Sequence, residues 1–171
     1  TPEQRQDPAA LTTLPPYYPD TPIVREDWKR NYELITAMDA WAGDHLRALE
    51  EAGLAEDTIV FYWSDHGVGL PRAKRWLYDS GTRIPLIVRI PEKFRVEGQG
   101  TPGAVVNELI SSVDFGPTVL NLAHQAVPEI MQGRAFLGEN PDPAPDYVFG
   151  ARDRMDERYD MQRGVRSKQF K

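Results

Sequence analysis

The stretch Thr58–Gly67, with the sequence TIVFYWSDHG, constrains the fold of this chain more than any other. Its first part, Thr58–Trp63, is β-branched and aromatic with almost no polar interruption. Such a run is typical of a strand buried on both faces, as in the parallel sheet of an α/β protein. The run stops at Ser64, where a carboxylate, an imidazole and a glycine follow. Open α/β sheets place their ligands at the carboxyl ends of strands, so this point is a candidate functional site.

Asp65 and His66 are the two side chains with coordination chemistry at this point. Asp65 offers hard oxygen and His66 offers nitrogen, so together they could supply two ligands to one divalent metal. The alternative is structural: Asp65 caps the next turn and His66 hydrogen-bonds locally. The adjacent pair alone does not decide between these interpretations.

A second apolar strand is predicted over Ile84–Ile90, where Pro91 ends it. The loop between the two strands, Val68–Ser80, concentrates basic residues that include Lys74. Two strands joined by a functional loop fit one α/β sheet. A basic loop is usually solvated surface, but this one follows a candidate metal pair, so one of its cations could face an anionic substrate.

The remaining pattern predicts further elements. A long helix is expected from Glu26 or Asp27 to a stop at Gly53. The others are an edge-like strand over Val105–Ile110, a helix capped by Ser111, Ser112 or Asp114 with Pro117 in its first turn, and two short strands, Tyr147–Gly150 and Val165–Phe170, that flank a polar loop. The charged residues of that loop are interpreted mainly as solvated surface.

Composition excludes several classes of function. The formal net charge of −6 argues against a nucleic-acid partner, which usually meets a basic face. The sequence has no cysteine, which rules out disulfides, thiolate metal sites and a cysteine nucleophile within these residues. No apolar run approaches the length needed to span a membrane. The 171 residues amount to one domain or part of a larger one.

The segment SDHGVGLPRAKRWLYDSGTRIPLIVRIP resembles the sulfatase family of the alkaline-phosphatase superfamily. In that family a buried strand ends in Asp-His-Gly or Asp-Asn-Gly, a lysine follows shortly, and a run of the form LYxxGxRxPLIVRxP comes next. Two later strings, SVDFGPTVLNLA and MQGRAFL, are similar to the family elements VDLAPTLLDLAG and MxGRSLL. The matching residues of the first segment are Asp65, His66, Gly67, Lys74, Leu77, Tyr78, Gly81, Arg83, Pro85 to Arg89 and Pro91.

The resemblance implies an α/β fold. We expect part of an alkaline-phosphatase-like mixed sheet flanked by helices, followed by the start of a smaller C-terminal subdomain with antiparallel strands. The expected boundaries are an extended connecting segment at 1–26, the C-terminal part of the catalytic domain at 27–125, and the beginning of the C-terminal subdomain, truncated, at 126–171.

The resemblance also implies a chemistry. Sulfatases hydrolyse sulfate esters or sulfamates with a formylglycine made from a Cys/Ser-x-Pro/Ala-x-Arg motif, and a divalent cation, commonly calcium, holds the sulfate oxygens. By resemblance, Asp65 and His66 are metal ligands, and Lys74 is a catalytic and substrate-binding cation on the sulfate or leaving-group oxygen. Arg83 is a candidate substrate-binding residue that could instead brace the strand. The implied substrate is a sulfated small molecule or glycan, and the implied location is periplasmic or secreted.

Part of the family's catalytic unit is missing from these residues. No serine precedes x-Pro-x-Arg, and the family's other metal ligands, a pair of aspartates after its first strand, would lie upstream of Thr1. We therefore expect the chain to require an N-terminal part of a longer protein and to be inactive alone. Two alternatives stay open: a phosphate or phosphonate ester hydrolase of the same superfamily, and a degenerate sulfatase-like module that binds without catalysis.

Overall fold

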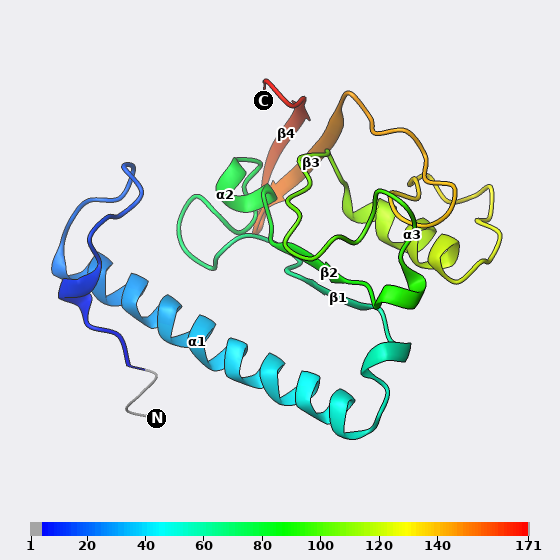
Figure 1. The fold of residues 1–171 in the computed structure, drawn as a ribbon. Coiled ribbons are helices and arrows are strands. Elements are labelled where there is room, and N and C mark those ends of the chain that lie inside the picture. Colours follow the sequence, from blue (N-terminus) through cyan, green and yellow to red (C-terminus); the bar gives the residue numbers. More distant parts are fainter. Residues whose placement is uncertain (1–4, 171) are drawn as a thin grey trace. The chain divides into compact units, whose positions relative to one another are not determined.

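The computed structural model describes residues 5–170 of the chain (Figure 1). These residues form two compact units, one ending at Asp57 and the other beginning at Thr58. The first unit contains the 3₁₀ turn Pro8–Ala10, the helix α1 (Pro22–Glu51) and the 3₁₀ turn Ala55–Asp57. Residues 1–4 of the expected connecting segment lie outside the described residues. No helix in the described part of the chain is both long and apolar enough to cross a membrane.

Helix α1 begins earlier than the sequence pattern predicted. Its N-cap is Thr21, whose side chain accepts a hydrogen bond from the backbone N–H of Val24, and Pro22 occupies the first turn. A threonine cap followed by proline starts a helix because the hydroxyl satisfies a free N–H and proline has none to satisfy. The prediction had placed the start at the acidic residues one turn later. The end agrees with the prediction, since Gly53 adopts a left-handed φ of 71° just after the last turn.

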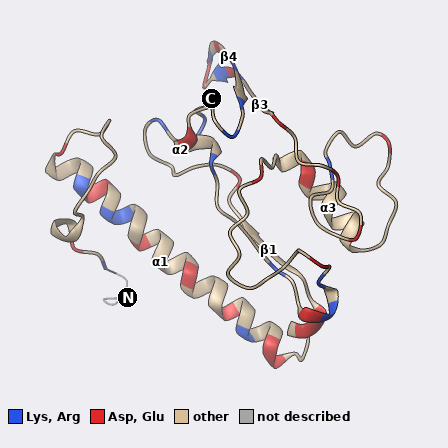
Figure 2. Ribbon diagram, turned by 45° about the horizontal axis from the view of Figure 1, so that its top comes forward, with Lys and Arg blue, Asp and Glu red and all other residues tan. Residues whose placement is uncertain are grey.

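Charged pairs run along α1, and Figure 2 shows both signs along the helix. Near its start, Lys29 lies 3.0 Å from Glu26 and 3.7 Å from Glu33. The hydrogen bond from Lys29 lowers the pKa of the Glu26 carboxyl, and in the same way the hydrogen bond from Arg25 lowers the pKa of Asp20. These carboxylates are exposed, so each pair adds little to stability.

The second unit opens with the strands β1 (Val60–Trp63) and β2 (Leu86–Arg89), which pair with each other as the prediction of one sheet required. They run antiparallel, with Val60 opposite Arg89 and Trp63 opposite Leu86, so a parallel arrangement is wrong for this pair. The connection between them, residues 64–85, contains only the short helix α2 (Asp79–Thr82), whereas the crossover of a parallel pair is usually a full α-helix. The predicted burial on both faces is wrong for both strands, because Trp63 of β1 is 49% exposed and alternate residues of β2 are exposed, with Ile87 at 62%.

A second antiparallel pair, β3 (Val148–Met155) and β4 (Arg158–Arg166), confirms the antiparallel C-terminal strands. The strands are longer than predicted and include the charged stretch that was interpreted as a loop, but β4 ends at Arg166, so the strand predicted to continue to Phe170 is wrong there. Only two residues connect them, and the first, Asp156, has a left-handed φ of 52°. Such a tight turn lets oppositely charged side chains face each other across the pair, as Arg163 and Asp153 do at 2.6 Å.

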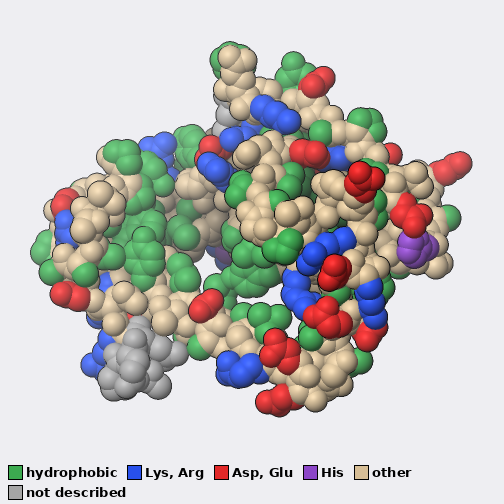
Figure 3. All heavy atoms as spheres, viewed as in Figure 1, with side chains coloured by type: hydrophobic (Ala, Val, Ile, Leu, Met, Phe, Trp, Pro, Cys, Tyr) green, Lys and Arg blue, Asp and Glu red, His purple; other side chains and the backbone are tan. Residues whose placement is uncertain are grey.

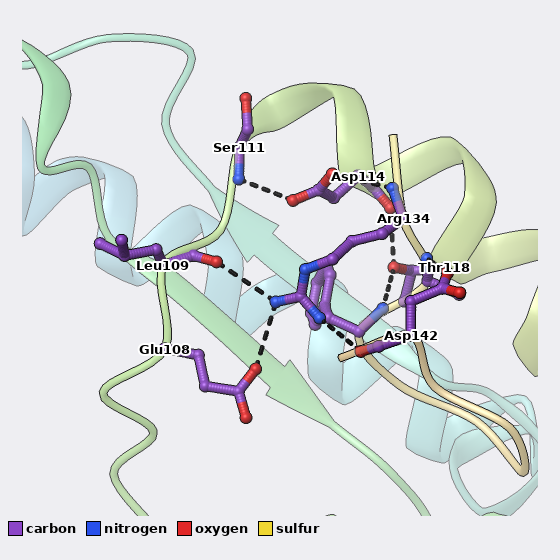
Figure 4. Close-up of polar contacts among 9 residues, drawn as sticks. Glu108, Leu109, Ser111, Asp114, Thr118, Arg134 and Asp142 are labelled. Carbon is purple, nitrogen blue, oxygen red and sulfur yellow. Dashed lines mark hydrogen bonds and ion pairs between the residues drawn. The ribbon is translucent and has the colours of Figure 1, made fainter. Parts of the chain in front are cut away.

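The helix α3 (Phe115–Leu122) follows a 3₁₀ turn at Ser112–Asp114, with Pro117 in its first turn as predicted. Asp114 is buried and accepts hydrogen bonds from the backbone N–H groups of Ser111, at 2.9 Å, and Arg134, at 3.0 Å. Figure 4 shows the guanidinium of Arg134 between the Glu108 carboxylate and the backbone carbonyls of Leu109 and Asp142. This cluster joins α3 to the segment that contains the MQGRAFL string.

Replacing Asp114 by alanine is expected to destabilise the protein by about 2–4 kcal/mol, because two partly buried N–H groups would lose their acceptor. The midpoint of urea unfolding measures this loss. The matched control is Asp146→Ala, which removes an exposed carboxylate and should change stability by less than about 0.5 kcal/mol. Equal midpoints for the two variants would show that the Asp114 cluster contributes nothing to stability.

Much apolar surface of the second unit is open. Its buried apolar side chains among the described residues include Ala73, Ile90 and Ala135, whereas Phe149 is 75% exposed. Figure 3 shows hydrophobic side chains at the surface of the face that is turned toward the viewer in Figure 1. The strand predicted over Val105–Ile110 is wrong, since this segment is irregular and Val105 is 83% exposed. A β-branched run forms a strand only where a neighbouring strand accepts its backbone hydrogen bonds, and none pairs with it among residues 5–170.

Candidate active site

The candidate site begins in the turn directly after β1. The hydroxyl of Ser64 donates a hydrogen bond to the backbone carbonyl of His66 at 2.6 Å, which closes the chain into a tight turn. The Asp65 side chain is 84% exposed and that of His66 is 33% exposed. The carboxylate oxygens of Asp65 are therefore open to an incoming ligand.

A hydrogen bond fixes the orientation of the His66 ring. Its Nδ1 atom lies 2.6 Å from the carbonyl oxygen of Gly67, which can only accept, so Nδ1 carries the proton. In the neutral ring Nε2 then holds a lone pair. Nε2 lies 3.5 Å from Oδ1 of Asp65. Two electron-rich atoms thus face each other, an arrangement that a shared cation or a proton on Nε2 would stabilise.

The separation of these two atoms suits a metal ion. Two ligands at right angles around a cation with bonds of about 2.4 Å lie about 3.4 Å apart. The observed distance of 3.5 Å between Nε2 and Oδ1 is close to that value. A histidine whose other ring nitrogen donates to a backbone carbonyl is also the usual form of a metal ligand. Asp65 and His66 therefore fit a divalent cation as two of its ligands. No group of three or more metal-binding side chains occurs among residues 5–170.

The loop after this turn folds back on it and leaves no room for a side chain at Gly67. The backbone N–H of Gly67 donates to the carbonyl of Gly81 at 3.2 Å. A Cβ atom at Gly67 would lie 1.8 Å from the carbonyl oxygen of Ser80. Only glycine allows this approach, which brings the end of β1 beside α2.

Lys74 lies within this loop, and its side chain is exposed. Its backbone N–H donates to the carbonyl of Val68 at 3.0 Å, and the preceding residue, Ala73, is completely buried. The buried alanine anchors the loop so that the neighbouring lysine projects outward. The residues Arg72 and Arg75 on either side have left-handed φ angles of 63° and 71°.

Arg83 lies between α2 and β2, where its backbone N–H donates to Asp79 at 2.8 Å and its side chain is exposed. The structure thus brings Asp65 and His66 together. No hydrogen bond or ion pair joins Lys74 or Arg83 to that pair within the described part of the chain. The roles of Lys74 and Arg83 stay predictions.

The sequence interpretation missed Arg152. This residue belongs to the charged stretch that was taken for a solvated loop, yet only 8% of it is exposed. Its guanidinium lies 4.4 Å from the ring centroid of Trp76 and donates to the carbonyl of Arg75 at 2.9 Å. The sequence itself does not mark Arg152, because the next two residues, Asp153 and Arg154, are charged as well.

Comparison with known proteins decides the family. The sulfatase family model matches residues 6–125, which is more than half of the chain. This chain belongs to the sulfatase family. The resemblance inferred from the Asp-His-Gly turn and its following lysine is thereby confirmed.

The relatives of this sulfatase chain include several named sulfatases. It is 43% identical over 158 residues to the ulvan-active sulfatase of Formosa agariphila, covering 92% of this chain and 26% of that protein. It is 37% identical over 119 residues to the human N-sulphoglucosamine sulphohydrolase, covering 69% of this chain and 22% of that protein. The chain therefore spans about a quarter of the length of these two curated relatives.

A solved structure supports the fold of the sulfatase chain. The phosphonate monoester hydrolase SpPMH from Silicibacter pomeroyi matches with a TM-score of 0.65 and 30% sequence identity. The match covers 86% of this chain and 30% of that structure. The expected α/β fold of the alkaline-phosphatase type is confirmed.

Proposed function

We propose that the protein containing this chain hydrolyses sulfate esters or sulfamates, with Asp65 and His66 supplying part of its metal site. The carrying observation is the His66 ring, whose Nδ1 donates to Gly67 and whose Nε2 lies 3.5 Å from Asp65. Family membership and the named sulfatases among the relatives support the same reaction.

Calcium is the proposed cation, on the resemblance to other sulfatases and on the hard oxygen that Asp65 offers. When bound, a divalent cation would draw negative charge from the sulfate oxygens and so favour attack on sulfur. Lys74 would place a positive charge on the sulfate or leaving-group oxygen. Arg83 would bind the substrate anion or brace the start of β2.

The nucleophile has to come from outside these 171 residues. The sequence holds no cysteine and no serine in a Ser-x-Pro-x-Arg pattern, so no formylglycine can form within it. We propose that this chain is the C-terminal portion of the catalytic unit in a longer sulfatase. The chain covers only about a quarter of the ulvan-active and N-sulphoglucosamine relatives, and the side chains of Phe149, Val105 and Ile87 are exposed, and both observations support that proposal.

The proposed substrate class is a sulfated small molecule or glycan, which the names of the ulvan-active and N-sulphoglucosamine relatives support. A second candidate is hydrolysis of phosphonate or phosphate esters, because the structural neighbour is a phosphonate monoester hydrolase. Both chemistries need charge stabilisation at a tetrahedral centre. We favour sulfate esters because this chain is 43% identical to the ulvan-active sulfatase but only 30% identical to the phosphonate monoester hydrolase.

Metal removal tests this proposal. Full-length protein that contains this chain is expected to hydrolyse an aryl sulfate, to lose that activity after dialysis against a chelator, and to regain it when calcium is added. The isolated 171 residues serve as the control and should remain inactive with calcium, because they lack a nucleophile. Undiminished turnover in protein shown to be metal-free would contradict the proposed metal role. Turnover by the isolated chain would contradict the proposal that the nucleophile lies outside these 171 residues.

A further inference from the structure

In the loop that carries Lys74, the backbone adopts an unfavourable conformation on both sides of the lysine. Arg72 and Arg75 adopt φ angles of 63° and 71°. A side chain with a Cβ atom rarely occupies this region, and such residues persist where the surrounding structure holds them. The position of Lys74 therefore depends on contacts that fix this local conformation.

The strand pair β3–β4 supplies such a contact through Arg152. One guanidinium nitrogen donates to the carbonyl oxygen of Arg75, the left-handed residue directly after Lys74, at 2.9 Å. The same guanidinium stacks 4.4 Å from the centroid of the Trp76 ring and forms an ion pair with Asp160 on β4. Arg152 thus holds two consecutive residues of the loop and is itself held by the neighbouring strand.

Further contacts between the loop region and the strand pair reinforce this one. Arg75 forms an ion pair with Asp156 in the turn between β3 and β4. Arg166 on β4 forms an ion pair with Asp79 at the start of α2. Figures 1 and 2 show the helix α2 beside the strand pair. Leu77 packs closely against Gly150. A Cβ atom at position 150 would lie 3.2 Å from a methyl group of Leu77.

We propose that Arg152 is a positioning residue that sets the place of Lys74 by fixing the conformation of Arg75. The inference rests on the proposed role of Lys74 in the hydrolysis. Arg152 is 8% exposed, and its guanidinium is engaged by Trp76, Arg75 and Asp160, so it acts through the loop and not by touching substrate. An arginine suits this role because its planar fork can stack on an indole and donate to a carbonyl at the same time.

The test compares variants of the full-length protein by steady-state hydrolysis of an aryl sulfate. Arg152→Ala is expected to lower kcat by about 10- to 100-fold, since a small displacement of a reacting group has effects of this size, with KM changed less. Arg152→Lys should recover only part of the rate, because lysine keeps the charge but not the fork. The matched control is Arg158→Ala, an exposed arginine at the start of β4, which should stay within about twofold of wild type.

A double-mutant cycle separates positioning from general stability. If Arg152 acts through Lys74, adding Arg152→Ala to Lys74→Ala should lower kcat by less than about twofold further. Hydrogen exchange in the same proteins should show faster exchange of the Lys74 and Trp76 amides in Arg152→Ala, since both N–H groups hydrogen-bond within the loop. If Arg152→Ala does not fold, Asp160→Asn tests the same point by loosening the partner of Arg152.

Each outcome decides between the proposals. If the fold-losses in kcat of the two single variants multiply in the double variant, the positioning role of Arg152 is overturned. Unchanged amide hydrogen exchange in the loop of Arg152→Ala would overturn it as well. A loss in Lys74→Ala with none in Arg152→Ala would overturn this inference and leave the proposed function standing. Wild-type activity in Lys74→Ala would overturn the proposed role of Lys74 and, with it, the positioning of that residue by Arg152.

Discussion

Replacing Asp65 by alanine is expected to abolish calcium binding and to lower kcat/KM for an aryl sulfate by about 10³-fold or more. The variant removes the only carboxylate that lies beside Nε2 of His66 among the described residues, at 3.5 Å. With the carboxylate gone, this chain would contribute one imidazole nitrogen to the metal site, and neutral nitrogen is a poor ligand for a hard cation. Titration calorimetry with calcium and steady-state kinetics on the full-length protein measure the two losses separately.

Asp146→Ala is the matched control for that variant, because it removes an exposed carboxylate remote in sequence from the turn after β1. It should bind calcium and turn over substrate as the wild type does. An Asp65→Ala protein that keeps both its calcium and its rate would show that the carboxylate caps the turn and does not bind metal. Asp65 and His66 would then have the structural role of capping the turn and hydrogen-bonding locally, and not that of metal ligands.

Lys74→Ala is expected to lower kcat by about 10²- to 10³-fold while leaving the fold intact. The reason is that a cation on the sulfate or leaving-group oxygen stabilises charge that develops in the transition state. The side chain is exposed, so its removal leaves no cavity. Steady-state kinetics give the rate, and the circular dichroism spectrum checks the fold.

Lys168→Ala, which removes an exposed lysine beyond β4, is the control for this second variant and should keep full activity. Lys74→Arg should retain part of the rate, because it preserves the charge but changes its reach. A Lys74→Ala rate within a few-fold of wild type would assign this lysine to solvated surface instead. The positive charge on the substrate would then have to come from Arg83 or from residues outside this chain.

The local parts of this structure could be predicted from the sequence. The apolar run before Ser64 predicts β1, and the adjacency of Asp65 and His66 places both at its end without any knowledge of the fold. The end of α1 follows from Gly53, whose left-handed backbone needs no partner elsewhere. Its start was misplaced because acidic residues were weighed above the Thr21-Pro22 cap.

What the sequence pattern could not supply is pairing between distant segments. The antiparallel register of Val60 with Arg89 depends on how the intervening loop folds back, which periodicity does not encode. The burial of Arg152 depends on Trp76, a residue far away in the sequence, and on Asp160 across the turn. A charged stretch becomes a strand pair here because these partners meet it, and the same charges without partners would favour a loop.

The most direct measurement for the central claim is the ratio of kcat/KM for an aryl sulfate to that for a phosphonate monoester with the same leaving group. It is made on the full-length protein with calcium present. We expect the sulfate ester to be preferred by at least about tenfold, which corresponds to about 1.4 kcal/mol in transition-state binding. A preference for the phosphonate, or no turnover of the sulfate ester, would contradict it.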